Sequence, residues 1–280
     1  MKTSSQGFGA VEAHYSHDGL EASILAALVA AGKDPDNLKP EDLAPFDEFH
    51  VRGRKATLEL ARELNLSEGM KVLDVGSGVG GPSRCLAQEF GCLVTGIDLC
   101  SEYCRVASML ARRLGLDSLV TYRHGNALDM PFEDAAFDLL WTQHAAMNIA
   151  DKDRFYAEMR RVLKPGGSLA IYDVLDGEGG APHYPLPWAR DPSTSFLLTS
   201  QQMRNSLEKE GFVVQTWRDK TETARFWFRN LSDKIRVEGD PPLGIHLLLG
   251  SDFRVMAQNL VRNLEENRVA LIEAVVRCPA

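Results

Sequence analysis

A glycine-rich turn after a strand-like segment is the clearest chemical feature of this sequence. An apolar run over residues 70–75 leads into residues 76–81, Gly-Ser-Gly-Val-Gly-Gly, and a helix-forming segment begins at Pro82. A strand, a turn without bulky side chains and a helix N-terminus together let backbone N–H groups approach a ligand closely. The turn therefore predicts a binding site for a nucleoside-like cofactor.

Two classes of cofactor fit this turn. Gly76, Gly78 and Gly81 match the dinucleotide pattern G-x-G-x-x-G, and Asp98 lies about 20 residues on, where a ribose-binding acid belongs. Asp74 favours the second class, S-adenosylmethionine, over a dinucleotide. At the end of the strand its carboxylate would repel a pyrophosphate but attract the ammonium and sulfonium of S-adenosylmethionine. We therefore expect S-adenosylmethionine as the cofactor. The alternatives are that the protein is an NAD-dependent dehydrogenase, or that Asp74 only caps the turn.

Five segments in the right order make the chain similar to class I S-adenosylmethionine-dependent methyltransferases over about residues 45–220. The first is the turn itself, and residues 96–99 resemble the family's second-strand acid. Residues 125–127, Gly-Asn-Ala, resemble the adenine-edge segment, which usually reads Gly-Asp-Ala. Residues 137–144 match the fourth strand, and residues 161–169 match the turn into the fifth. Within the family, the chain most resembles the small-molecule subgroup with the sarcosine/dimethylglycine, tocopherol and sugar O-methyltransferases.

The resemblance assigns most of a cofactor site. It implies that Asp98 holds the ribose hydroxyls and that an N-terminal lid carries Tyr15 over the cofactor. It also implies that residues 49–53 fold over the methionine end, where His50 or Arg52 meets the carboxylate. Ordinary packing of the lid helix and of this loop is the alternative. The cofactor-binding residues implied in this way are Tyr15, His50, Arg52, Asp74, Gly76, Ser77, Gly78, Asp98, Leu99, Asn126, Ala127 and Gln143.

His144 and Asp173 are the candidate catalytic pair. His144 follows the fourth expected strand and Asp173 ends the fifth, and these strands are neighbours in the family's sheet. A carboxylate beside an imidazole fixes its tautomer and raises its basicity, which suits removal of a proton from an acceptor hydroxyl or amine. The alternative is that His144 only lines the cofactor pocket and Asp173 caps its strand.

Hydrophobic and amphipathic segments alternate through the middle of the chain, which is typical of a parallel sheet with helices on both faces. With the resemblance, this predicts an α/β, Rossmann-like, doubly wound seven-stranded sheet with an antiparallel last strand. We expect an N-terminal helical lid at 1–65, an S-adenosylmethionine-binding core at 66–220 and 268–280, and an inserted substrate cap at 221–267. Strands are expected near 70–75, 92–97, 119–123, 137–142, 168–173, 212–218 and 269–277. Helices are expected near 8–32, 54–64, 81–90, 101–114, 152–162 and 200–210. Residues 33–45 are expected to form a connector.

Composition restricts the partners. The 280-residue chain is 44% hydrophobic and has a formal net charge of −8, which argues against a nucleic-acid partner. No apolar run reaches the about 18 residues that a membrane span needs, so we expect no membrane insertion. The five cysteines are odd in number and match no common zinc spacing, which indicates reduced thiols in a cytoplasmic protein and no metal site.

The expected reaction moves a methyl group from S-adenosylmethionine to an O or N atom of a small-molecule metabolite. A protein that binds the cofactor without turnover is a further alternative. Six aromatic residues after the fifth strand and in the insertion are either core or the wall of an acceptor pocket: Tyr184, Trp188, Phe196, Phe226, Trp227 and Phe228. The aromatic insertion could instead serve a homodimer. The sequence does not identify the acceptor.

Overall fold

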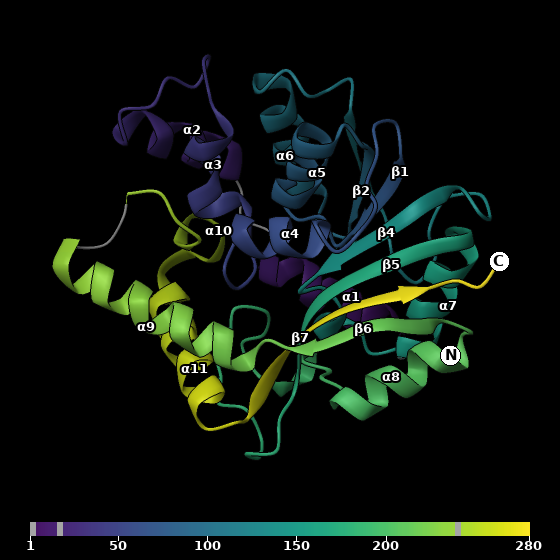
Figure 1. The fold of residues 1–280 in the computed structure, drawn as a ribbon. Coiled ribbons are helices and arrows are strands. Elements are labelled where there is room, and N and C mark those ends of the chain that lie inside the picture. Colours follow the sequence, from purple (N-terminus) through teal and green to yellow (C-terminus); the bar gives the residue numbers. More distant parts are fainter. Residues whose placement is uncertain (1–3, 16–18, 239–241) are drawn as a thin grey trace.

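A single seven-stranded sheet forms the centre of the computed structural model, which describes residues 4–15, 19–238 and 242–280 (Figure 1). The strand order is β3-β2-β1-β4-β5-β7-β6, and β7 runs antiparallel to both of its neighbours. This confirms the predicted Rossmann-like sheet with an antiparallel last strand. The strands are β1 (Lys71–Val75), β2 (Leu93–Asp98), β3 (Val120–His124), β4 (Phe137–Gln143), β5 (Leu163–Asp176), β6 (Val213–Asp219) and β7 (Val269–Arg277).

Helices cover both faces of this sheet, because alternate residues of each strand point to opposite sides. The helices are α4 (Arg54–Ala61), α5 (Gly81–Phe90), α6 (Ser101–Arg113), α7 (Lys152–Val162) and α8 (Ser200–Lys209). On one face, Val72 and Trp141 share a buried cluster with Leu60 of α4. On the other, Leu73 packs in a second cluster with Phe155 of α7. The parallel strands therefore end together at one edge, held rigidly from both sides.

Three helices precede α4. They are α1 (Ser4–Tyr15), α2 (Leu20–Ala30) and α3 (Pro40–Asp47). The expected helix at 8–32 is two helices, and the connector expected at 33–45 is wrong from residue 40 onward. Pro40 occupies the first turn of α3, where its missing N–H costs nothing, and the Asp42 carboxylate accepts the Lys39 N–H at 2.9 Å. Buried Leu43 and Phe46 then fix α3 against α2 and α6.

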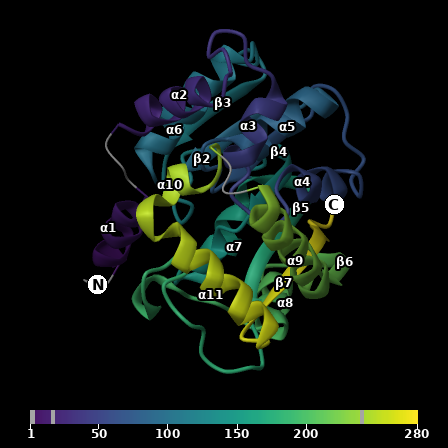
Figure 2. The ribbon, with the colours of Figure 1, turned by 90° about the vertical axis from the view of Figure 1, so that its left-hand side faces the viewer.

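Helices also fill the segment between β6 and β7. They are α9 (Thr221–Glu238), α10 (His246–Leu249), the short η3 (Gly250–Asp252) and α11 (Phe253–Glu265). α11 packs along α9, and α10 contacts α2 and α3. Figure 2 shows α10 and α11 reaching from the β7 end of the sheet to the N-terminal helices. Among the residues that the structure describes, no helix has both the length and the apolar character required to cross a bilayer.

Candidate functional site

A cavity of about 2280 Å³ opens at the carboxyl ends of the parallel strands. Ligands of open parallel sheets bind at this edge, because loops from several strands converge there. The N-terminal helices and the α9–α11 insertion form its other walls. Most sequence-predicted site residues line it: Tyr15, His50, Arg52, Gly76, Ser77, Gly78, Asp98, Leu99, Asn126, Ala127, Gln143 and His144.

The glycine turn forms the floor of the cavity, but its first three N–H groups are already occupied. The Gly76 and Ser77 N–H groups donate to the Ile97 carbonyl at 2.9 and 3.1 Å, and the Gly78 N–H donates to Asp98 Oδ2 at 2.8 Å. For these three groups the geometry contradicts the expectation that the N–H groups of the turn meet the ligand. Gly76 is needed for another reason: its φ is +77°, and an added Cβ would lie 2.5 Å from the Ala145 Cβ.

Asp98 links the turn to the end of β2. Its Oδ2 accepts the Gly78 N–H, and its Oδ1 accepts the Cys100 N–H at 2.8 Å. Burial raises the pKa of Asp98 above its usual range, and these two hydrogen bonds oppose that rise. The carboxylate is thus fixed in orientation in the wall of the cavity, with acceptor capacity left on each oxygen.

The loop after β3 supplies the next part of the wall. Asn126 Oδ1 accepts the Leu128 N–H at 2.9 Å, so the side-chain carbonyl stabilises its own turn. The Asn126 N–H₂ donor remains for a ligand. Ala127 and Leu99 line the cavity on either side. This arrangement suits a planar heterocycle that offers an acceptor at its edge.

Asp74 lies beneath the turn and not in the cavity wall, which corrects the prediction that its carboxylate meets the ligand. It shares a strand face with Val72, and α5 covers that face. Ser83 of α5 donates to Asp74 Oδ2 at 2.5 Å. Burial raises the pKa of Asp74 to about 7, against the lowering effect of the Ser83 hydrogen bond. Asp74 is therefore a buried support of the turn.

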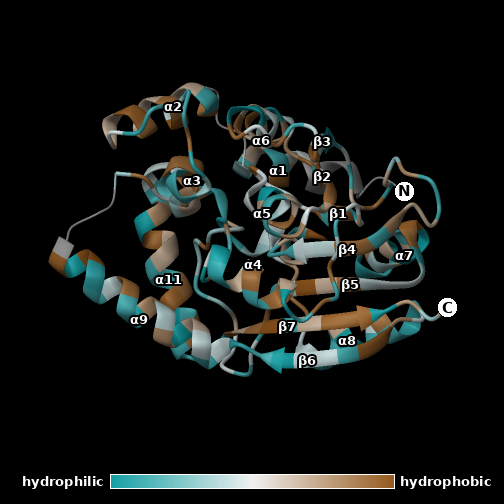
Figure 3. Cartoon of the chain, turned by 45° about the horizontal axis from the view of Figure 1, so that its top comes forward, coloured by the Kyte–Doolittle hydropathy of each residue, from teal (hydrophilic) through white to brown (hydrophobic). Residues whose placement is uncertain are grey.

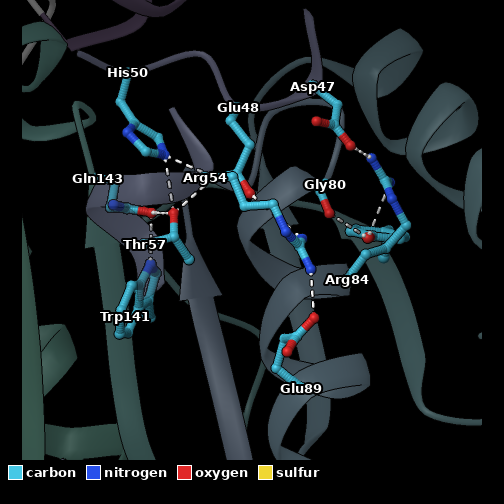
Figure 4. Close-up of polar contacts among 11 residues, drawn as sticks. Asp47, Glu48, His50, Arg54, Thr57, Gly80, Arg84, Glu89, Trp141 and Gln143 are labelled. Atoms are coloured by element: carbon cyan, nitrogen blue, oxygen red, sulfur yellow. Dashed lines mark hydrogen bonds and ion pairs between the residues drawn. The ribbon is translucent and has the colours of Figure 1, made fainter. Parts of the chain in front are cut away.

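A chain of hydrogen bonds crosses the cavity wall from the segment before α4 to the end of β4 (Figure 4). Glu48 Oε2 lies 2.9 Å from His50 Nε2 and accepts the Thr57 hydroxyl at 2.6 Å. Gln143 Oε1 accepts the Trp141 indole N–H at 2.9 Å and lies 3.2 Å from the Thr57 hydroxyl. Because its carbonyl is held in this way, Gln143 Nε2 is left buried without a hydrogen-bond partner.

Arg52 approaches the same wall. Its Nη2 lies 2.7 Å from both carboxylate oxygens of Glu59, while its buried Nη1 has no hydrogen-bond partner. The backbone of Arg52 has a φ of +71°, a conformation that side-chain-bearing residues rarely adopt. Such strain is retained where the surroundings fix it, often at functional sites. Arg52 thus combines one satisfied amino group with one that remains available.

His144 and Asp173 do not form the pair that the sequence suggested. The His144 ring stacks on Tyr172, with centroids 5.4 Å apart and 16° between planes, and faces His50 at 6.0 Å. Burial, and after it the charge of His50, holds the pKa of His144 well below its usual range. His144 Nε2 is buried without a hydrogen-bond partner. The imidazole is therefore neutral at pH 7.

Asp173 instead supports the turn after β4 from below. Its Oδ2 accepts the Ala146 N–H at 3.0 Å, and its Oδ1 accepts the Val174 N–H at 2.9 Å. Burial raises the pKa of Asp173 to about 6, although the Lys152 ammonium lowers it. Asp173 lies outside the lining of the large cavity. Its predicted catalytic role thus has no support from this geometry, because its oxygens serve backbone groups.

Tyr15 brings α1 to the cavity. Its hydroxyl donates to Asn148 Oδ1 at 2.9 Å, and Asn148 in turn donates to the Trp188 and Thr194 carbonyls at 2.7 and 2.9 Å. Burial, and then the charges of Asp98 and Asp173, raises the pKa of Tyr15. α1 is thus tied to the long loop after β5 through one asparagine.

Glu48, Thr57 and Arg84 are site-forming residues that sequence reasoning missed. Arg84 of α5 lies 2.7 Å from Asp47 in a buried ion pair, which holds the end of α3 against the glycine turn (Figure 4). At the same place, a Cβ on Gly81 would lie 2.2 Å from the Asp47 carbonyl oxygen. The only signal in the sequence was the charged run at residues 47–50, Asp-Glu-Phe-His, which matched no chemical pattern by itself.

Several buried polar atoms of the wall lack a hydrogen-bond partner in the protein. They are Ser77 Oγ, Arg52 Nη1, Gln143 Nε2, His144 Nε2, Tyr103 Oη and one acceptor oxygen, Glu48 Oε1. Buried polar groups are nearly always hydrogen-bonded in native proteins, so such a cluster indicates a polar ligand. The donors of this cluster match a carboxylate, and Asp98 matches a diol. No group of three or more His, Cys, Asp or Glu in the described part of the chain could hold a metal ion.

Comparison with known proteins agrees with this geometry. The methyltransferase domain family matches residues 73–171. Methyltransferase GfsG of Streptomyces halstedii is 37% identical over 134 residues, 48% of this chain and 48% of that protein. Sterol 24-C-methyltransferase of Eremothecium gossypii is 39% identical over 184 residues, 66% of this chain and 47% of that protein. The matches thus span about half the length of these curated relatives.

The fold is shared with solved structures of methyltransferases. Phosphoethanolamine N-methyltransferase 2 of Haemonchus contortus, solved with S-adenosyl-L-methionine, superposes with a TM-score of 0.71 at 21% identity, over 93% of this chain and 57% of that one. At this identity the likeness concerns the fold alone. Residues 73–171 are thus a methyltransferase domain in sequence, and the chain shares the fold of these solved methyltransferases.

Proposed function

We propose that the protein is an enzyme that transfers a methyl group from S-adenosylmethionine to an O or N atom of a small molecule. The observation that carries this proposal is the pattern of the cavity wall. It places the Asp98 carboxylate, the Asn126 amide and the partnerless donors of Arg52 and Gln143 around one space. These groups complement, respectively, the ribose diol, the adenine edge and the methionine carboxylate of the cofactor.

Each predicted cofactor residue except Asp74 then has a proposed role. Asp98 would accept the ribose hydroxyls, with Leu99 beside the ring, and Asn126 and Ala127 would hold the adenine. The remaining residues (Gly76, Ser77, Gly78, Gln143, His50 and Arg52) would surround the methionine end, with Tyr15 above it. When bound, S-adenosylmethionine supplies a methyl group that its sulfonium has already activated. The chain then has to align the acceptor and exclude water, which can contribute about 7–11 kcal/mol.

His144 is the proposed proton acceptor for a hydroxyl or ammonium substrate. Its imidazole is neutral at pH 7, lines the cavity and has a ring nitrogen without a protein partner. General-base catalysis of this kind contributes about 10²–10⁴-fold. Tyr172 orients the ring by stacking and by accepting the His144 backbone N–H at 2.8 Å. In this proposal Asp173 is not a catalytic residue.

The organisation predicted from the sequence also stands as a proposal. Residues 1–65 would act as a lid, residues 221–267 as a substrate cap, and residues 66–220 with 268–280 as the cofactor-binding core. The net charge of −8 supports a small-molecule acceptor over nucleic acid. The five buried free thiols support a reducing, cytoplasmic environment. Phe226, which is 62% exposed on α9, would suit a homodimer contact, and sedimentation analysis tests this.

Calorimetric titration with S-adenosylhomocysteine tests the cofactor assignment, because this product keeps the adenosine and amino-acid parts of the cofactor. Saturable binding is expected, and no heat at high ligand concentration would refute the proposal. Titration with NADH addresses the dehydrogenase alternative. Mass spectrometry of a metabolite extract incubated with enzyme and S-adenosylmethionine should reveal products heavier by one methyl group. Binding without any such product would favour a non-catalytic protein.

A further inference from the structure

The cavity is too large for one small cofactor. At about 2280 Å³ it exceeds the roughly 300–1,000 Å³ that is typical of small-molecule sites. The residues proposed to bind S-adenosylmethionine all lie on the strand ends, α1 and the segment before α4. A large further part of the wall comes from α9, α10, α11 and the loop after β5. A second compartment therefore remains for the acceptor.

The α9 side of this compartment is apolar. Trp227, Phe228, Leu231 and Ile235 line the cavity from α9 at helical spacing, and each is only half-buried by the protein. Figure 3 shows that hydrophobic and hydrophilic residues alternate along α9. A half-buried apolar stripe that faces a cavity leaves its exposed surface against solvent, which is unfavourable unless an apolar partner covers it.

The α11 side of the compartment is also lined by apolar residues. Phe253, Ala257, Leu260 and Val261 line the cavity at spacings of three to four residues. The charged lining residues of both helices are exposed to solvent. They are Lys234 and Arg236 of α9 and Arg254, Arg262 and Glu265 of α11. Apolar side chains therefore face inward from both helices, and the charged side chains remain in contact with solvent.

We propose that the methyl acceptor is a bulky, predominantly apolar molecule, larger than an amino acid or a single sugar, whose body lies between α9 and α11. This inference rests on the proposed function, because it takes the strand-end part of the cavity as the cofactor site. The accepting atom would reach inward to His144, which lines the same cavity. A small polar acceptor would leave most of the apolar wall uncovered and would gain little from it.

A neutral fluorescent apolar probe, N-phenyl-1-naphthylamine, tests this inference on the full chain saturated with S-adenosylhomocysteine. Ala257→Phe fills the compartment from the α11 wall. Val255→Phe adds the same side chain two residues away, on the exposed face of the same helix. The wild type and Val255→Phe should bind the probe equally, and Ala257→Phe should bind it at least tenfold more weakly. The S-adenosylhomocysteine affinity should be the same in all three proteins.

The outcomes separate the two proposals. Loss of S-adenosylhomocysteine binding in the wild type would refute the proposed function. Two results would overturn the apolar acceptor while S-adenosylhomocysteine binding stays normal. In the first, Ala257→Phe leaves the probe affinity unchanged; in the second, Val255→Phe reduces the probe affinity as much as Ala257→Phe does. If circular dichroism shows Ala257→Phe unfolded, Leu231→Gln, which makes the α9 wall polar, replaces it under the same criterion. Methylation of glycine or glucose in preference to long-chain or polycyclic alcohols and amines would also overturn the inference.

Discussion

Replacement of Asp74 by asparagine should remove a pH-dependent penalty on the stability of the fold. Asp74 is 2% exposed beneath the glycine turn, where burial raises its pKa from 3.8 to about 7. Asparagine keeps the size of the side chain and an oxygen that can accept the Ser83 hydroxyl, so the variant changes charge with little change in packing. The difference between the two proteins therefore isolates the ionisation of one group.

The sign follows from the proton balance. Between pH 4 and 7 the folded protein holds a proton on Asp74 that the unfolded chain has released, so the free energy of unfolding falls as pH rises. With one pKa unit equal to about 1.36 kcal/mol, the full penalty above pH 7 approaches about 4 kcal/mol. Between pH 5 and 8, Asp74 should account for a decrease of about 2–3 kcal/mol that the Asp74→Asn variant lacks.

Urea denaturation at pH 5, 6.5 and 8 measures this effect. The variant's new amide N–H₂ group adds a constant offset, so the quantity of interest is the change of the wild-type-minus-variant difference with pH. Asp117→Asn, at an exposed position after α6, is the control and should run parallel to the wild type. If the free energy of unfolding of Asp74→Asn changes with pH in parallel with that of the wild type, the Asp74 carboxyl is ionised at its usual pKa. The account of the buried turn is then wrong.

Three further predictions concern the site. Asp98→Ala should weaken S-adenosylhomocysteine binding by about 1–3 kcal/mol in calorimetry, because the ribose loses a charged acceptor; an unchanged affinity would contradict its ribose role. Gly76→Ala should lower the free energy of unfolding by more than the roughly 1–2 kcal/mol of a positive φ alone, because its Cβ would also meet Ala145. At Gly211, φ is +82° and the space around it is open, so Gly211→Ala should lower the free energy of unfolding only through the positive φ. His144→Ala should slow turnover about 10²–10⁴-fold with little change in S-adenosylhomocysteine affinity, and equal turnover would exclude it as the base.

The sheet could be predicted from the sequence because burial imposes a local pattern on each strand. Residues 137–143, for example, form an apolar run without helical spacing, and β4 occupies those residues. α3 was missed because its two prolines resemble a connector: Pro40 is in the first turn, where a helix tolerates proline, but Pro45 lies inside the helix, where proline is unfavourable. The error therefore arose from one residue type whose meaning depends on position within the helix.

The site was predictable in position but not in its contacts. Motif residues lie at the strand ends, and topology alone gathers strand ends at one edge. Partners such as Tyr15 with Asn148 are separated by 133 residues, and no spacing rule relates them. The role of Glu48 was equally hidden, because a carboxylate two residues from a histidine is common in exposed loops. Of the aromatic candidates, Trp188, Phe196, Trp227 and Phe228 line the cavity, although Trp188 is also buried in the core and Trp227 and Phe228 pack on it. Tyr184 packs on the core without lining the cavity, and Phe226 is exposed.

The glycine turn shows why a motif can favour the proposed ligand for an incomplete reason. A dinucleotide turn must keep its N–H groups free for a pyrophosphate. Here Ile97 accepts the Gly76 and Ser77 N–H groups and Asp98 accepts that of Gly78, so the turn has lost these donors. Asp74 adds a carboxyl below the same turn, and Asp98 places another in the wall. A pyrophosphate over these three positions would find no free N–H group and would lie near acidic groups, whereas a cationic sulfonium or ammonium would be favoured. The charge argument thus holds for the whole floor of the cavity and does not require direct contact with Asp74.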